Sequence, residues 1–398
     1  MTDEFRPLEM EGIDPQKQMY SWRSVVQKPY DKNTVDCYTR ARVILMNGIE
    51  NNAIAMAHAI ARMTSDEETR RELALLRRLD SLQQQQVEWL NPPDASFLET
   101  TIGYEQVAVD LTSNLAQNEP DPYFKQVLDY ALLEDFDHLF RYGCMLQLYQ
   151  NMDPNLITQG NTEFKPGRAT MDEHRHPQDE MRDHWDRTTA DLKSKMNYYT
   201  IVSAEQQTMN FYKNHGSMAF DDLGRRVYSE IADVEQQHVT QYESAGDGAA
   251  TPLEQMALME LCEAYNYFSC YVTETDQRFK KIWERLCAEE IGHFNAACSL
   301  LERKEGTSAE QLLHGQTTLP QLIVFQPNKE YVNEILEKTV DLRPVNKKFV
   351  PLSEVPSDWP SNAWNKAQNA DGSPTEDLTG MAEQQGKVPV VARDHAHV

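Results

Sequence analysis

The feature that most constrains the fold of this chain is an internal repeat. At a constant offset of 155 residues, acidic and histidine positions coincide, namely Glu50 with Glu205, Glu105 with Glu260, Asp135 with Glu290 and His138 with His293. The dipeptide Phe124-Lys125 coincides with Phe279-Lys280 at the same offset. A repeat of this length predicts two copies of one supersecondary unit, in which length changes are confined to the loops.

Each copy has the helical pattern of apolar residues four times over. The predicted helices are at about 34–61, 65–89, 97–117 and 121–150, and again at about 190–214, 219–244, 252–274 and 276–304. Asp121-Pro122 and Thr251-Pro252 each combine a capping side chain with a proline at the first helical position, which marks a helix start. Four long helices with short turns predict an all-α fold built from up-and-down four-helix bundles.

We therefore predict two tandem bundles, at 34–150 and at 190–305. Outside them we expect an N-terminal arm at 1–33, a polar, turn-rich linker at 151–189 and an extended tail at 306–398 that wraps the bundles. The tail has one short helical candidate near 328–338 and is expected to become disordered toward its end.

Composition narrows the function classes. A formal net charge of −25 argues against nucleic acid and anionic membrane surfaces as partners, because both require a basic face. The six cysteines form no Cys-x-x-Cys pair, so disulfides and zinc or rubredoxin-type knuckles are not expected. No run of 18 apolar residues and no signal-peptide pattern occurs, and we expect a soluble, cytoplasmic protein.

Two tetrads carry the chemistry: Glu235-Gln-Gln-His238 and Glu290-Ile-Gly-His293. Residues three apart are neighbours on one face of a helix, so each carboxylate and imidazole can reach a single point. Glutamates from two other helices would complete an inward-pointing ligand set for two metal ions. Hard carboxylate oxygens with two imidazoles suit iron or manganese, and the lack of thiolates argues against zinc and copper(I).

Further carboxylates lie on apolar stripes of the second copy. A carboxylate that faces a core is costly unless it is paired or bound to a cation. The alternative, solvent-exposed pairs at i and i+3, must explain four such carboxylates. The predicted metal ligands are Glu205, Glu235, His238, Glu260, Glu263, Glu290 and His293. Tyr242, one turn beyond His238, is a candidate catalytic residue, with an ordinary core tyrosine as the alternative.

The first copy departs from this pattern. For its second helix we align residues at an offset of 152, which places Gln83 on Glu235 and Gln86 on His238. Glutamine is a poor iron ligand, so one metal position should be lost. The remaining candidates, enough for one metal at most, are Glu50, Glu105, Asp135 and His138. We expect this bundle to be a structural partner of the second.

The ordered set Glu205, Glu235-x-x-His238, Glu260, Glu290-x-x-His293 resembles the ferritin-like di-iron carboxylate superfamily, with a spacing similar to its rubrerythrin and aldehyde-oxygenase branches. The resemblance implies a cofactor of two iron ions, with manganese able to replace one or both. It also implies that Glu235 or Glu290 bridges the metals and that each histidine binds one of them. Glu205 and Glu260 would be terminal ligands.

The resemblance further implies an oxidoreductase that activates O2 to oxidise or oxygenate a small organic substrate. The Cys-x-x-Cys electron-transfer domain of rubrerythrin is missing here, so electrons would come from a partner protein. One alternative is a rubrerythrin-like peroxide or O2 reductase, which Glu263 favours because it resembles the extra carboxylate of such sites. Another is a non-catalytic, metal-binding or scaffold subunit of an oxygenase complex. A homodimer is compatible with each of these readings.

Overall fold

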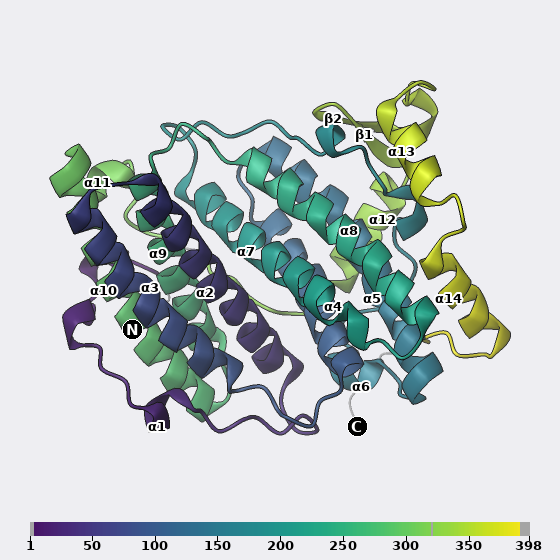
Figure 1. Ribbon diagram of the computed structural model, residues 1–398, viewed down its shortest axis with the longest axis horizontal. Coiled ribbons are helices and arrows are strands. Elements are labelled where there is room, and N and C mark those ends of the chain that lie inside the picture. The colour runs from purple at the N-terminus through teal and green to yellow at the C-terminus, as the bar shows by residue number, and fades with distance from the viewer. Residues whose placement is uncertain (1–3, 320, 391–398) are drawn as a thin grey trace.

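The structure is a computed structural model that describes residues 4–319 and 321–390. Its described part is all-α except for one two-stranded sheet (Figure 1). The long helices are α2 (Cys37–Met63), α3 (Glu67–Glu88), α4 (Phe97–Gln117), α5 (Pro122–Gln150), α7 (Leu192–His215), α8 (Asp222–Ala245), α9 (Pro252–Thr273) and α10 (Gln277–Glu305). Short α1 (Trp22–Val25) and α6 (Asn155–Thr158) precede α2 and follow α5. The predicted all-α class is confirmed.

Each long helix begins at a polar side chain that accepts a hydrogen bond from the first turn. These N-cap residues are Asp36, Asp66, Ser96, Asp121, Asp191, Asp221, Thr251 and Asp276. Capping satisfies backbone N–H groups that have no partner within the helix, and it fixes where the helix starts. Pro122 and Pro252 occupy the first helical positions of α5 and α9, as predicted.

Consecutive helices pack as four hairpins. Hairpin 1 is α2–α3, hairpin 2 is α4–α5, hairpin 3 is α7–α8 and hairpin 4 is α9–α10. Hairpins 2 and 3 pack together through α5 with α8 and α4 with α7, and we call this group bundle A. Hairpins 1 and 4 pack through α2 with α9 and α3 with α10, forming bundle B, on the opposite side of the molecule in Figure 1.

This pairing differs from the predicted one, because each bundle takes one hairpin from each copy of the repeat. The connections fit a bundle of hairpins 2 and 3 that has one long crossover. The segment 89–96 spans at most roughly 28 Å when fully extended, less than the roughly 33 Å length of a 22-residue helix. The segment 151–191 is long enough to cross a bundle, which is what a four-helix bundle with one crossover connection requires. Hairpins 2 and 3 are joined by it.

One cluster of buried apolar side chains extends through both bundles. A single cluster of buried side chains includes Val43 of hairpin 1, Leu111 of hairpin 2, Ile201 of hairpin 3 and Leu261 of hairpin 4. Helix α2 contacts α4 and α7, and α7 also contacts α9. Burial of apolar surface therefore holds the bundles against each other.

The N-terminal arm lies across α3 and α10. The Ile13 amide donates to the Ala288 carbonyl oxygen at 2.8 Å, which fastens the arm to the middle of α10. A Cβ atom at Gly292 would lie 1.8 Å from the Ile13 carbonyl oxygen, so this close approach requires glycine. The arm thus covers the helix face beside Glu290 and His293.

The C-terminal segment is more ordered than predicted. It contains α11 (Ala309–Leu312), α12 (Lys329–Thr339), a ribbon of β1 (Leu342–Val345) and β2 (Lys348–Pro351), α13 (Pro360–Gln368) and α14 (Pro374–Gln384). Helix α12 confirms the short helix predicted near 328–338. Helix α14 packs against α5 and α8, because Leu378 and Ala382 are buried there. The expected disorder is therefore wrong for α14, while residues 391–398 lie outside the described part.

Candidate metal centre

Two clusters of buried acids and histidines lie inside the bundles. Cluster A, in bundle A, consists of Glu105, Asp135, His138, Glu205, Glu235 and His238. Cluster B, in bundle B, consists of Asp80, Glu260, Glu290 and His293. Every member of both clusters is at most 1% exposed. Buried acid and histidine clusters that could hold metal ions are therefore present in each bundle.

The ligand positions repeat once per hairpin. A glutamate on the first helix is followed 30 residues later by an acid on the second, giving Glu50 and Asp80, Glu105 and Asp135, Glu205 and Glu235, and Glu260 and Glu290. A histidine or glutamine follows each second acid by three residues. The spacing puts one carboxylate from each helix at the same height in the bundle, because the two helices of a hairpin run side by side.

This repeat corrects the alignment of α3. The offset of 155 holds throughout and places Asp80 on Glu235 and Gln83 on His238, without the three-residue slip. Hairpin 1 has therefore kept its carboxylate and lost only its imidazole. The similarity of the glutamine run to Glu235-Gln-Gln-His238 concealed Asp80, a residue that the sequence analysis missed.

Cluster A brings two imidazoles and four carboxylates from four helices to one place. His238 Nδ1 lies 3.3 Å from Asp135 Oδ1, 3.5 Å from Glu205 Oε2 and 3.4 Å from Glu235 Oε2. His138 Nδ1 lies 2.9 Å from Glu235 Oε1. The two imidazole ring centroids are 6.1 Å apart. Both histidines therefore direct the same ring nitrogen into the cluster.

Glu235 belongs to two ligand groups within cluster A. One group is Asp135, Glu205, Glu235 and His238, and the other is Glu105, His138 and Glu235. In each group the ligand atoms lie within 4.8 Å of one another. Burial disfavours ionisation of Glu235, but the adjacent imidazoles of His138 and His238 outweigh it and lower its pKa to about 2. Glu235 is therefore the one carboxylate of cluster A that belongs to both groups.

Many cluster A atoms have no hydrogen-bond partner among the described residues. They are both carboxylate oxygens of Asp135 and Glu205, one oxygen each of Glu105 and Glu235, and His238 Nδ1. Burial, followed by repulsion from Asp135, raises the pKa of Glu205 well above its ordinary value. Unpaired polar atoms at this depth are unfavourable. The donor set fits divalent cations, which would satisfy these atoms together.

A hydrogen bond from outside the cluster orients His238. His238 Nε2 lies 2.9 Å from Glu134 Oε2, so with Nε2 protonated the lone pair of Nδ1 faces the cluster. Arg175 pairs with Glu134 and lies 3.1 Å from Glu173 Oε2, which offsets part of the negative charge. Tyr212 donates a hydrogen bond to Glu105. None of these supporting residues was found from the sequence.

His138 lacks an equivalent anchor. Its Nε2 has no hydrogen-bond partner among the described residues. Glu134 immediately precedes Asp135, whereas the residue that precedes Glu235 is Val234, which cannot accept a hydrogen bond. The two histidines of cluster A are therefore held unequally.

The seven ligands predicted for the second copy are divided between the clusters. Glu205, Glu235 and His238 lie in cluster A, and Glu260, Glu290 and His293 lie in cluster B. Glu263 is buried beside cluster B, where burial and then repulsion from Glu290 and Glu260 raise its pKa. The first copy supplies the rest, so its acids and His138 are not an isolated remnant.

Tyr242 is buried next to cluster A. Its ring centroid lies 6.4 Å from that of His238, and its hydroxyl group has no hydrogen-bond partner within the described chain. Burial, then the negative charge of Glu205, raises the pKa of Tyr242 well above its ordinary value. The phenol therefore stays protonated near the cluster. Its catalytic role remains a prediction.

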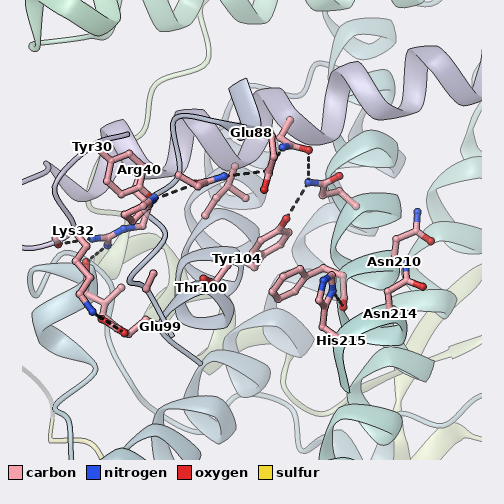
Figure 2. A pocket seen from close by; sticks show the side chains of 18 of the residues that line it. Tyr30, Lys32, Arg40, Glu88, Glu99, Thr100, Tyr104, Asn210, Asn214 and His215 are labelled. Atoms are coloured by element: carbon pink, nitrogen blue, oxygen red, sulfur yellow. Dashed lines mark hydrogen bonds and ion pairs between the residues drawn. The ribbon is translucent and has the colours of Figure 1, made fainter. Parts of the chain in front are cut away.

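A cavity of about 880 Å³ lies between the bundles, lined by α2, α3, α4, α7 and the segments beside them (Figure 2). Tyr30, Lys32 and Arg40 gather at one end, and Asn210, Asn214 and His215 lie at the other. Amide side chains dominate the lining, including Asn33, Asn47, Asn51, Asn91, Gln84, Gln159 and Gln207. A cavity of this size accommodates a small organic molecule.

Two aromatic rings of the cavity lining are next in sequence to residues at cluster A. Tyr104 and Phe211 both line the cavity and stack with centroids 4.3 Å apart. Each is followed in sequence by a residue of the cluster side, Glu105 and Tyr212, which are hydrogen-bonded to each other. The hydroxyl group of Tyr104 accepts from Gln207 at 2.9 Å.

Comparisons with protein-family models, with curated proteins and with solved structures found no match to this chain. None of the helices in the described ranges is both long enough and apolar enough to cross a membrane.

Proposed function

We propose that cluster A holds two metal ions, iron or manganese, and that the chain is a ferritin-like di-metal carboxylate oxidoreductase. The observation that carries the proposal is the position of Glu235, an acid shared by two ligand groups that each have their own histidine. One acid on each first helix and an acid-x-x-His on each second helix is the ligand pattern of such bundles. A pair of iron ions held by carboxylates supplies two electrons together for the activation of O2 or peroxide.

The surrounding residues would control the centre. Glu134 keeps the proton on His238 Nε2, and Tyr212 donates to Glu105 and fixes its orientation. Arg175 limits the excess negative charge, which keeps the cluster from repelling its own ligands. The buried phenol of Tyr242 is a protonated group near the ligands.

The cavity between the bundles is the proposed substrate site. Its amide groups and the aromatic rings of Tyr30, Tyr104 and Phe211 suit a small, neutral, polar organic molecule. An external electron-transfer protein would reduce the metals. Glu263, which favoured a rubrerythrin-like peroxide reductase, is buried beside cluster B, so nothing at cluster A separately supports that alternative.

The test is O2 consumption by the metal-loaded protein. Metal-free protein is loaded anaerobically with Fe²⁺ and then exposed to O2 or to hydrogen peroxide. We expect O2 uptake with the near-ultraviolet absorption of a ferric pair, and loss of both in Glu235→Ala. Glu243→Ala is the control, because Glu243 is an exposed glutamate on the same helix. Faster consumption of peroxide than of O2 would favour the reductase, and no metal at cluster A would leave a scaffold role.

A further inference from the structure

Cluster B is a reduced version of cluster A. The offset of 155 relates Asp80 to Glu235, Glu260 to Glu105, Glu290 to Asp135 and His293 to His138. These four residues are the ones whose ligand atoms lie within 4.8 Å of one another. Cluster A also contains Glu205 and His238, whose counterparts in hairpin 1 are Glu50 and Gln83. Neither Glu50 nor Gln83 belongs to the cluster B group. Replacement of an imidazole by Gln83 therefore removes one metal position and leaves one.

The remaining position has the geometry of a ligand set. His293 Nδ1 lies 3.1 Å from Asp80 Oδ1, 3.0 Å from Glu290 Oε2 and 3.6 Å from Glu260 Oε2. All four side chains are fully buried. Both oxygens of Asp80 and of Glu260, and one oxygen of Glu290, have no hydrogen-bond partner within the described ranges. Buried oxygens without a hydrogen bond are unfavourable, and a cation bound beside His293 Nδ1 would satisfy them.

The surroundings of cluster B do not neutralise these acids. Glu50 accepts a hydrogen bond from Tyr267 at 2.5 Å, so one of its oxygens is already occupied. Glu263 adds a further buried carboxylate, both of whose oxygens lack a hydrogen bond from the described chain.

The N-terminal arm supplies the orienting group for His293. Gln18 is buried, and its Oε1 lies 2.9 Å from His293 Nε2. Its Nε2 donates to the carbonyl oxygens of Ile13 and Glu289, which fixes the amide so that Oε1 accepts. His293 therefore carries its proton on Nε2 and turns the lone pair of Nδ1 to the acids, as His238 does through Glu134.

We propose that cluster B is a second, separate metal centre that binds one hard divalent cation, Mn²⁺ or Fe²⁺. Asp80, Glu260, Glu290 and His293 are its ligands, and Gln18 of the arm is a positioning residue that acts through His293. Three carboxylates and one imidazole suit these metals rather than zinc or copper(I). The centre does not depend on the activity proposed for cluster A.

The test is the binding of Mn²⁺ alone to metal-free, full-length protein. We expect three Mn²⁺ per chain and the six-line paramagnetic resonance spectrum of an isolated Mn²⁺ beside a coupled pair. Glu260→Gln should bind two and lose the six-line spectrum, whereas Glu302→Gln, an exposed position on α10, should retain both. A wild-type spectrum without the six lines, or a Mn²⁺ count and spectrum that do not change in folded Glu260→Gln, would overturn the proposal. The wild-type spectrum alone decides if that variant does not fold.

The role of Gln18 has its own readout. Gln18→Ala should weaken Mn²⁺ binding at cluster B by about 10- to 100-fold and broaden the six-line spectrum, since the ring of His293 would no longer be fixed. Binding of the coupled pair should not change. The control is Gln16→Ala, an exposed glutamine in the same arm. Equal effects of the two substitutions, or none from either, would contradict a positioning role.

Discussion

The hydrogen bond between Glu134 and His238 determines which imidazole nitrogen faces cluster A. Glu134 Oε2 lies 2.9 Å from His238 Nε2, and both side chains are fully shielded from solvent. In Glu134→Ala the proton is free to move to Nδ1, which would then be unable to bind a cation. The substitution also leaves the buried Arg175 paired with Glu173 alone.

The structure sets the size of the effect. Loss of a group that orients a ligand histidine lowers metal affinity by about 10- to 100-fold, or about 1.4 to 2.7 kcal/mol. Only the group containing Asp135, Glu205, Glu235 and His238 should weaken. Glu134→Gln should retain most of the affinity, because its amide oxygen can still accept from Nε2. Removing one partner of a buried ion pair should also reduce stability by about 3 kcal/mol.

The assay is Mn²⁺ titration of metal-free protein, with circular dichroism to verify folding. Glu289→Ala is the matched control, because Glu289 is the counterpart of Glu134 at the offset of 155. The carboxylate of Glu289 lies 3.5 Å from the Gln83 amide nitrogen and not beside an imidazole. We expect the control to leave both cluster A affinities unchanged. Wild-type affinity in a folded Glu134→Ala protein, or equal losses in both variants, would refute this reasoning.

Two further predictions concern charge and the missing imidazole. Burial raises the pKa of Asp110 to about 7, above its unfolded value, so its contribution to stability declines as pH rises from about 4 to about 7. In urea unfolding, the free energy of unfolding of Asp110→Asn minus that of the wild type should increase by about 2 kcal/mol from about pH 5.5 to about pH 8.5. A difference that does not change with pH would contradict this. Gln83→His should restore the second position of cluster B, raising Mn²⁺ from three to four per chain and replacing the six-line spectrum with a coupled one. A folded variant that still binds three would oppose this interpretation.

The long helices and their chemistry could be predicted from the sequence because both are local properties. Caps such as Asp121 and Thr251 fix helix starts, and the helical period determines which residues face inward. The acid-x-x-His spacing on α8 and α10 predicted residues that lie in the buried clusters, without any knowledge of their partners.

The pairing of the hairpins could not be predicted from local pattern, because it depends on long-range packing. Glu235 and Glu290 belong to the same copy of the repeat, yet they lie in different clusters. The loop lengths did contain a signal, since 89–96 is too short to cross a bundle and 151–191 is not. The residues outside the helical repeat, such as Gln18, had no periodic pattern that could connect them to a histidine 275 positions away.

Asp80 could have been found from the sequence by counting alone. The spacing of 30 residues from the first glutamate to the second acid is the same in all four hairpins, and a helix interior cannot absorb an insertion of three residues without rotating its ligand face. Local similarity around Gln83 and Gln86 favours the offset of 152, whereas the constant spacing of 30 residues requires the offset of 155. The constant spacing reflects the requirement that the two acids of a hairpin lie at the same height in the bundle.

The central claim is that Glu235 is shared by two metal ions held by hairpins 2 and 3. Anomalous diffraction at the iron and manganese edges, from crystals of the loaded protein, tests it most directly. We predict two peaks in cluster A, one next to His138 and one next to His238, with the Glu235 carboxylate in contact with both. A single peak in cluster A, no peak there, or two peaks that Glu235 does not join would contradict the claim.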